Sequence, residues 1–297
     1  MRPRRAATTA CIALAAAAAV AAVSATALTG TANAAPGAPA KPAGSAGFAG
    51  VSAAAQSATL AYWTPARMES ATPDLASGPA AGPPGNIPHS KSVNGVRTVG
   101  ALFYTTGSER HFCTGSVLQN PRGDSVLTAA HCVYSGGAYN RSIEFVPGYH
   151  NGRRPYGAYP VSGVDVGDWP QDYNPNLDTA FLTVRGNVES RTGALKLGFN
   201  EGYAHSIEVI GYNDSANLPI ECATRSFRLT TRTLDQMAFY CTNYNDGTSG
   251  SPLILNYNQR TGGGTVFGDL GGYERGGDFA WESYSPYFCY LTCTGTQ

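Results

Sequence analysis

Short apolar runs separated by turn-forming residues dominate the chain from about residue 93 onward. These runs are rich in β-branched and aromatic side chains and end at Gly, Asn, Asp or Pro. Such runs favour β-strands, whereas amphipathic helical periods are nearly absent. We predict strands at residues 99–104, 125–130, 143–146, 180–184, 207–211, 226–230, 252–255 and 265–270. The spacing of these strands indicates an all-β barrel or sandwich.

The N-terminus has the pattern of an export signal. Arg2, Arg4 and Arg5 precede an Ala-rich apolar run over residues 10–23, and small residues follow at 32–34. This predicts a signal peptide over residues 1–34 and a secreted, extracellular protein. The run is too short to predict a membrane span, and no other segment is longer. We therefore expect no membrane contact after signal cleavage.

Residues 35–90 are dominated by Ala, Pro, Gly and Ser. Such a composition buries too little apolar surface to offset the entropy of ordering, which predicts a low-complexity linker or propeptide. Residues 60–65 are an exception, because they include Tyr62 and Trp63. Two interpretations remain open here: the two aromatic rings dock on the folded domain, or they form an apolar patch of disordered chain.

The net charge of the remaining chain argues against nucleic acid as a partner. From residue 91 onward there are 15 Lys and Arg residues and 18 Asp and Glu residues, a net charge of −3. No basic run or aromatic stripe offers a face for phosphates. We expect a monomer with one large core or two small ones.

The cysteine pattern indicates disulfides. Cys11 leaves with the predicted signal, and six cysteines remain, an even number in an exported chain. No Cys-x-x-Cys pair is followed by a second pair or by two histidines, so we expect no metal site. Nothing else in the sequence calls for a cofactor.

Residues 247–252 form the most informative hexapeptide, in which Ser249 stands between glycines just before an apolar strand. Glycines let the backbone turn tightly and bring its amides close to a ligand. Acyl transfer needs two amides aimed at one oxyanion, and the amides of Gly247 and Ser249 are the candidates. An ordinary Gly/Ser turn is the alternative.

His131 ends a predicted strand whose last residues are small, Thr128, Ala129 and Ala130. Small neighbours leave the imidazole room to reach a partner. A histidine near neutral pH can take a proton from a hydroxyl and return it to a leaving amine. The other four histidines have no comparable context.

Asp178 directly precedes the apolar strand that begins at Ala180. A partly buried carboxylate is costly unless it is hydrogen-bonded, and an imidazole N–H is a suitable donor. A turn-forming Asp is the alternative, and we assign that role to Asp165, Asp168 and Asp172.

Together the Thr-Ala-Ala-His-Cys, Asp-Thr-Ala-Phe-Leu and Gly-Thr-Ser-Gly-Ser-Pro segments resemble the signature segments of chymotrypsin-like serine proteases of bacteria. The order His131, Asp178, Ser249 is also that of the family. The resemblance covers about residues 99–287 and implies two packed six-stranded antiparallel β-barrels with the active site between them. Residues 91–195 would form the first barrel and residues 196–297 the second.

The resemblance also implies a disulfide between Cys113 and Cys132 beside the histidine. Cys222 and Cys241 are the next pair, which leaves Cys289 and Cys293. A bridge between residues so close in sequence is geometrically unfavourable.

Thr248 stands where animal trypsins carry the Asp that binds a newly cut N-terminus. That activation switch is absent, so maturation would act in another way, through a cut between residues 85 and 99. The run Thr-Ser-Gly-Ser-Pro is most similar to the glutamyl endopeptidase branch, yet no histidine follows His205 to select an acidic side chain.

Substrate selectivity in this family depends on residues that correspond to Asn243, Tyr244 and the strand around Asp269. If Asp269 faces the pocket, its charge favours Lys or Arg substrates. The chain also ends without the amphipathic helix that usually closes the family's second barrel.

The sequence thus predicts a secreted serine endopeptidase that cleaves protein or peptide substrates through an acyl-enzyme on Ser249. A catalytically silent relative, acting as an exported binding module, is the main alternative. A carbohydrate-binding β-sandwich that uses Trp169 and Tyr173 is a further one.

Overall fold

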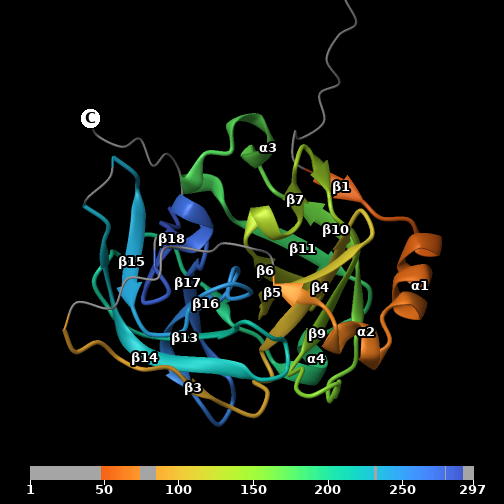
Figure 1. Cartoon of the computed structure of the whole chain (residues 1–297), viewed down its shortest axis with the longest axis horizontal. Coiled ribbons are helices and arrows are strands. Elements are labelled where there is room, and N and C mark those ends of the chain that lie inside the picture. The colour runs from red at the N-terminus through yellow and green to blue at the C-terminus, as the bar shows by residue number, and fades with distance from the viewer. Residues whose placement is uncertain (1–47, 74–84, 231–232, 278, 290–297) are drawn as a thin grey trace, which may run out of the picture. The chain divides into compact units, whose positions relative to one another are not determined.

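The computed structural model describes residues 48–73, 85–230, 233–277 and 279–289, and all of them belong to one structural unit (Figure 1). The predicted signal peptide and its cleavage site lie outside the described residues. Among the described residues, no helix has the length and apolar character needed to cross a membrane.

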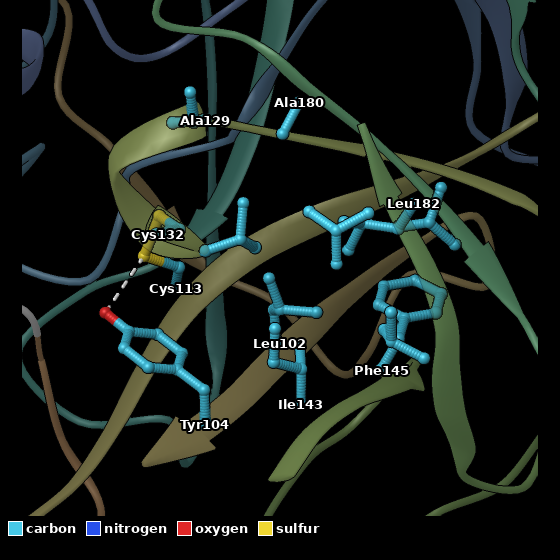
Figure 2. Close-up of a cluster of buried hydrophobic side chains, with 14 of the residues drawn as sticks. Leu102, Tyr104, Cys113, Ala129, Cys132, Ile143, Phe145, Ala180 and Leu182 are labelled. Carbon is cyan, nitrogen blue, oxygen red and sulfur yellow. Dashed lines mark hydrogen bonds between the residues drawn. A yellow bond between two sulfur atoms is a disulfide. The ribbon is translucent and has the colours of Figure 1, made fainter. Parts of the chain in front are cut away.

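Six antiparallel strands close into a first barrel. They are β4 (Val99–Thr106), β5 (Glu109–Leu118), β6 (Ser125–Thr128), β9 (Arg141–Pro147), β10 (Tyr159–Asp165) and β11 (Ala180–Val184). The order is β10-β11-β6-β5-β4-β9, and β9 pairs with β10 to complete the ring. Inward-facing side chains such as Leu102, Phe145 and Leu182 fill the barrel (Figure 2). The predicted first barrel is confirmed.

A second barrel follows with the strand order β17-β16-β13-β14-β15-β18. These strands are β13 (Ser206–Tyr212), β14 (Pro219–Arg228), β15 (Gln236–Tyr240), β16 (Pro252–Asn258), β17 (Gly263–Asp269) and β18 (Glu282–Pro286). Gly268 of β17 lies directly against the Ser285 side chain of β18, so the two end strands of the sheet face each other. The all-β fold of two barrels predicted from sequence is therefore confirmed.

The remaining elements after residue 90 are short. Four are two-residue strands: β3 (Lys91–Ser92) on β14, β12 (Lys196–Leu197) on β17, and the pair β7 (Tyr134–Ser135) and β8 (Ala138–Tyr139). The helices have three or four residues each: η1 (Ala130–Cys132), α3 (Trp169–Asp172), η2 (Pro175–Leu177), α4 (Glu189–Thr192) and η3 (Tyr273–Gly276). The expected scarcity of helix holds in this part of the chain.

Residues 48–73 form a folded segment on the first barrel. It contains β1 (Phe48–Gly50) on β10, α1 (Ala53–Tyr62), α2 (Pro65–Glu69) and β2 (Thr72–Pro73) on β5. Ser52 and Thr64 cap the two helices by accepting hydrogen bonds from backbone amides. Of the two roles predicted for residues 35–90, a low-complexity linker does not hold for this part, because composition alone missed two capped helices, whereas a propeptide stays a prediction.

Trp63 anchors this segment. Its side chain is 1% exposed, its ring centroid lies 5.3 Å from that of Phe103, and its Nε1 donates to the Ser142 carbonyl at 2.6 Å. Of the two interpretations of residues 60–65, docking on the folded domain is the one that the structure shows.

We expect Trp63→Ala to lower the free energy of unfolding by about 3–5 kcal/mol, since it removes a buried ring together with its hydrogen bond. Urea unfolding of the uncleaved chain, followed by circular dichroism, measures this loss. The neighbouring Tyr62→Ala is the control, with an expected loss of about 1 kcal/mol or less because the Tyr62 ring is partly exposed. Equal stability of wild type and Trp63→Ala would show that the segment does not stabilise the barrel.

Candidate active site

The antiparallel pairing of β6 with β11 brings His131 and Asp178 to the same end of the first barrel. Ala180 of β11 lies opposite Thr128 of β6. His131 lies in η1, three residues after Thr128, and Asp178 directly follows η2, two residues before Ala180. The strand register thus places side chains 47 residues apart in sequence next to each other.

Asp178 is fully buried and accepts three hydrogen bonds. His131 donates its backbone amide to Oδ1 at 2.9 Å, and its Nδ1 lies 2.7 Å from Oδ2. The Gly272 amide donates to Oδ2 at 2.7 Å. An ionised carboxylate can only accept hydrogen bonds, so Nδ1 carries the ring proton and Nε2 is left with a lone pair.

Nε2 of His131 is buried and has no hydrogen-bond partner among the described residues. The whole His131 side chain is 2% exposed. A buried ring nitrogen with a free lone pair is the arrangement that a general base needs, because a hydroxyl that reaches it can transfer a proton.

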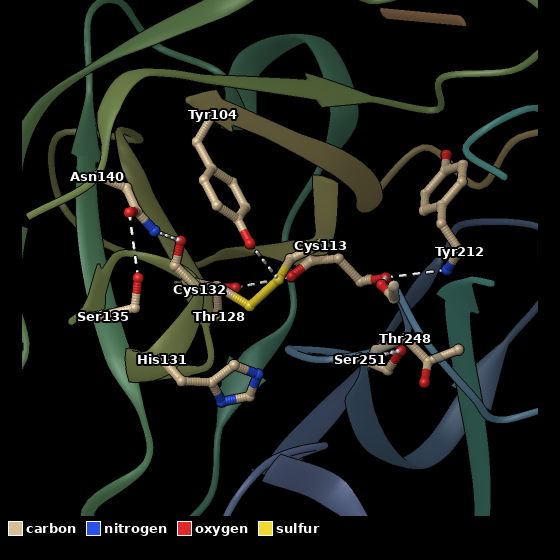
Figure 3. The surroundings of a disulfide bond; sticks show 12 residues. Tyr104, Cys113, Thr128, His131, Cys132, Ser135, Asn140, Tyr212, Thr248 and Ser251 are labelled. Carbon is tan, nitrogen blue, oxygen red and sulfur yellow. Dashed lines mark hydrogen bonds between the residues drawn. A yellow bond between two sulfur atoms is a disulfide. The ribbon is translucent and has the colours of Figure 1, made fainter. Parts of the chain in front are cut away.

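A disulfide between Cys113 of β5 and Cys132 of η1 fixes the turn that carries His131 (Figure 3). Asn140 also donates to the Cys132 carbonyl at 2.9 Å. Both sulfur atoms lie close to His131 but are bonded to each other, so they cannot serve as thiolate ligands for a metal. The bridge therefore restrains the position of the histidine.

The loop that carries Ser249 is fastened to the first barrel through Thr114 of β5. The Thr114 amide donates to the Ser249 carbonyl at 2.8 Å, and its hydroxyl donates to the Gly247 carbonyl at 3.2 Å. Thr128 in turn donates its hydroxyl to the Thr114 carbonyl at 2.8 Å. Ser249 is therefore held beside the end of β6 that leads into His131.

Gly250 shows how tight this contact is. It adopts φ +83°, and a side chain there would collide with the Thr114 carbonyl and the Thr128 hydroxyl. Only glycine combines this backbone conformation with such a close approach. The Ser249 side chain itself is 3% exposed, and its hydroxyl makes no hydrogen bond to a described residue.

The two amides predicted to hold an oxyanion differ in hydrogen bonding from those next to them in the loop. The amides of Thr248 and Gly250 are used, donating to the carbonyls of Asn245 at 3.1 Å and Leu270 at 2.7 Å. Those of Gly247 and Ser249 donate to no residue in the described part of the chain. Two free backbone donors one residue apart suit a developing negative charge.

The structure does not support Asp269 as a charged pocket residue. Its side chain is fully buried at the end of β17, where Oδ1 accepts a hydrogen bond from the Thr179 hydroxyl at 2.6 Å. Burial, together with the nearby Asp178 carboxylate, raises the pKa of Asp269 well above its usual range. A carboxyl group that is fully buried and hydrogen-bonded to Thr179 is not open to Lys or Arg side chains of a substrate.

Tyr244, the second residue expected to bind substrate, is also buried. Its ring lies in the core of the second barrel, and its hydroxyl donates to the Val209 carbonyl at 2.6 Å. Burial raises the pKa of this hydroxyl well above its usual range. Asn243 alone of the three predicted residues is exposed, and its side chain donates to the Ser90 hydroxyl at 3.2 Å.

The aromatic pair of the carbohydrate-binding alternative does not form an exposed platform. Trp169 belongs to the core of the first barrel and packs edge-on against Tyr173, with ring centroids 5.5 Å apart. Only Tyr173 is exposed. A sugar-stacking surface needs open ring faces, so this observation disfavours the alternative.

The second expected disulfide joins Cys222 of β14 to Cys241, the residue that follows β15. Cys289 is also disulfide-bonded. Cys293 lies outside the described residues.

The sequence did not predict the contacts that three residues make in the site: Thr114, Thr179 and Gly272. Thr114 and Thr179 directly follow Cys113 and Asp178, which is the only sequence signal for either of them. No local pattern marks Gly272, because its contact with Asp178 spans 94 residues.

Comparisons with known proteins agree with this architecture. Residues 87–280 match the trypsin family. No curated protein sequence matches the chain.

Several solved structures share the fold. The protease Anisep from Arthrobacter nicotinovorans has a TM-score of 0.60 at 23% identity, over 68% of this chain and 94% of its own. The thermostable serine protease AL20 from an extremophilic microorganism has a TM-score of 0.58 at 21% identity, over 65% and 92%. A Glu endopeptidase in complex with MPD has a TM-score of 0.51 at 17% identity, over 69% and 93%. Similarity at this level shows a common fold.

Proposed function

The chain belongs to the trypsin family, and we propose that it is a serine endopeptidase with Ser249 as nucleophile, His131 as base and Asp178 as the group that orients the base. One observation carries the proposal. Asp178 holds Nδ1 of His131, which leaves Nε2 buried and unpartnered beside the loop of Ser249. This is the arrangement by which a hydroxyl becomes a nucleophile.

The proposed reaction begins when a substrate carbonyl enters beside Ser249. The Ser249 hydroxyl attacks the carbonyl carbon and gives its proton to Nε2 of His131, while the Asp178 carboxylate stabilises the resulting imidazolium. The amides of Gly247 and Ser249 bind the oxyanion. His131 then protonates the leaving amine, which frees the new N-terminus and leaves an acyl-enzyme. Water, activated by the same nitrogen, hydrolyses the ester and restores Ser249.

This chemistry is completed by side chains and backbone amides alone, so the proposal includes no cofactor. The substrate is a protein or peptide, and the enzyme acts as a monomer without nucleic acid. Disulfides are typical of exported proteins, which supports a secreted enzyme released from its signal peptide at residue 34. A maturation cut between residues 85 and 99 completes the proposal.

Labelling with a fluorophosphonate tests the proposed nucleophile, because these reagents react with activated serine hydroxyls. We expect a single adduct, located by mass spectrometry at Ser249 and absent from the His131→Ala variant. Ser251, two residues away, is an internal control, because its hydroxyl is buried and donates to the Thr248 carbonyl at 2.6 Å. It should remain unmodified.

The exported binding module is the contrary outcome of the same experiment. A folded, secreted protein that takes up no fluorophosphonate and cleaves no denatured protein substrate would support that alternative. An adduct on a residue other than Ser249 would contradict the assignment of the nucleophile.

A further inference from the structure

Asp269 occupies a position that neither substrate binding nor the proposed reaction explains. It lies at the end of β17, opposite Pro252 of β16, with its side chain fully buried. Oδ1 accepts a hydrogen bond from the Thr179 hydroxyl at 2.6 Å. Oδ2 has no partner among the described residues. Burying a carboxyl group is costly when one of its two oxygens has no hydrogen-bond partner. The position of Asp269 therefore calls for an explanation.

The segment that begins at Asp269 connects the two halves of the candidate site. The Leu270 amide donates to the Ser251 carbonyl at 2.8 Å, and the Leu270 carbonyl accepts from the Gly250 amide. Two residues later, the Gly272 amide donates to Asp178. Backbone bonds from this segment therefore hold the Ser249 loop on one side and the Asp178 carboxylate on the other.

Asp269 adds the side-chain link of the same segment. Thr179, which it holds, directly follows Asp178 in the chain. The bond between Asp269 and Thr179 thus restrains the backbone of residues 178–179 against the strand that holds the serine loop. Without it, Asp178 would depend on its own three hydrogen bonds for its position.

The two neighbouring carboxyl groups differ sharply in the number of donors that they face. Asp178 accepts from three N–H groups, which stabilise a negative charge, whereas Asp269 accepts from one hydroxyl. Two buried carboxylates so close together repel each other, so the group with fewer donors takes up the proton. Burial and the charge of Asp178 both raise the pKa of Asp269.

On the basis of the proposed function, we propose that Asp269 is a positioning residue. As a neutral carboxylic acid it holds Thr179, and through Thr179 also Asp178, against the strand that holds the Ser249 loop. It takes no part in substrate recognition. Its burial beside the Asp178 carboxylate favours the protonated form.

Ionisation of Asp269 would add a second buried negative charge beside Asp178. In the segment between η2 and β11, Asp178 is the titratable group whose charge raises the pKa of Asp269, and Thr179 is neutral. From the neighbouring strands, β16 presents Pro252 opposite Asp269 and β18 presents Ser285 against the adjacent Gly268, neither of which titrates. Activity should therefore fall as rising pH removes this proton.

Four variants separate this role from its alternatives in kcat and KM measurements. Asp269→Asn preserves both the shape and the neutral state, so we expect kcat at neutral pH within about threefold of wild type and a smaller alkaline decline. Asp269→Ala and Thr179→Val both remove the link, and each should lower kcat by about tenfold or more with little change in KM. Thr179→Ser keeps the hydroxyl, so its kcat should stay close to that of wild type.

A second readout does not depend on catalysis. A buried acid with a raised pKa stabilises the fold less as pH rises, because the unfolded chain releases the proton first. Asparagine does not titrate. From about pH 5 upward, Asp269→Asn should therefore gain stability over wild type, by up to about tenfold in the folding equilibrium constant per pH unit.

Three results would overturn the proposal. The first is an equal loss of kcat in Asp269→Asn and Asp269→Ala. The second is a stability difference between Asp269→Asn and wild type that does not change with pH. The third is an effect of Asp269→Ala that is confined to KM for basic substrates. Fluorophosphonate labelling distinguishes failure of the proposed function from failure of the proposed role of Asp269. If wild type takes up no label at Ser249, the pH dependence of unfolding still tests whether Asp269 is neutral.

Discussion

Ser249→Ala is expected to abolish cleavage of a denatured protein substrate, with kcat lowered by about 10⁶-fold. The reason is that the acyl-enzyme forms on this hydroxyl and no other group replaces it. Stability should remain within about 0.5 kcal/mol of wild type, because the hydroxyl makes no hydrogen bond that folding depends on. Initial rates and urea unfolding of the purified secreted protein measure the two effects.

Ser251→Ala is the matched control, since it removes the other serine of the same hexapeptide. Its buried hydroxyl donates to the Thr248 carbonyl at 2.6 Å, so this variant should lose about 1 kcal/mol of stability and keep most of its activity. Ser249→Ala should thus lose activity and keep its stability, whereas Ser251→Ala should lose stability and keep most of its activity. Undiminished cleavage by Ser249→Ala would remove Ser249 from the proposed mechanism.

Asp178→Asn is expected to lower kcat by about 10⁴-fold, the size of loss found when the Asp of a Ser-His-Asp site becomes Asn. Both carboxylate oxygens of Asp178 accept bonds from N–H groups. The amide –NH₂ of Asn must therefore face a donor in either orientation. When the –NH₂ group faces Nδ1 of His131, Nδ1 must accept a hydrogen bond, so the ring proton moves to Nε2. Nε2 then has no free lone pair and cannot act as the base.

The same mismatch should also reduce the free energy of unfolding by about 1–3 kcal/mol, because a buried N–H loses its acceptor. Asp172→Asn is the control. Asp172 is exposed, and its Oδ1 accepts from the Asn174 amide at 3.0 Å, a bond that an Asn oxygen preserves. We expect wild-type activity and stability for it. Comparable rates for the two variants would show that Asp178 does not orient the base.

The candidate triad was predictable because each member lies in a short segment whose neighbours explain its role. Small residues precede His131, an apolar strand follows Asp178, and glycines flank Ser249. Local sequence records such requirements, since backbone turns and strand ends depend on adjacent residues. The succession of short apolar runs predicted the all-β class for the same reason, whereas the two barrels were implied by the resemblance to chymotrypsin-like serine proteases.

Residues 48–73 show where composition misleads. An Ala-rich stretch resembles a linker when averaged, yet two capped helices and one buried indole were enough to dock it. The stabilising contacts of Trp63 are with Phe103 and Ser142, far away in sequence. Averaging over a segment cannot detect a single anchor of this kind.

The sequence by itself determined the all-β class, and it predicted an export signal and three candidate catalytic residues, because each of these patterns depends on periodicity or on immediate neighbours. Only the tertiary structure decided that Asp269 and Tyr244 are buried, that Gly272 binds Asp178 and that Thr114 holds the Ser249 loop. Burial and long-range hydrogen bonds arise when distant strands pack together. The charge and role of a side chain such as Asp269 are therefore set by neighbours that the linear order does not show.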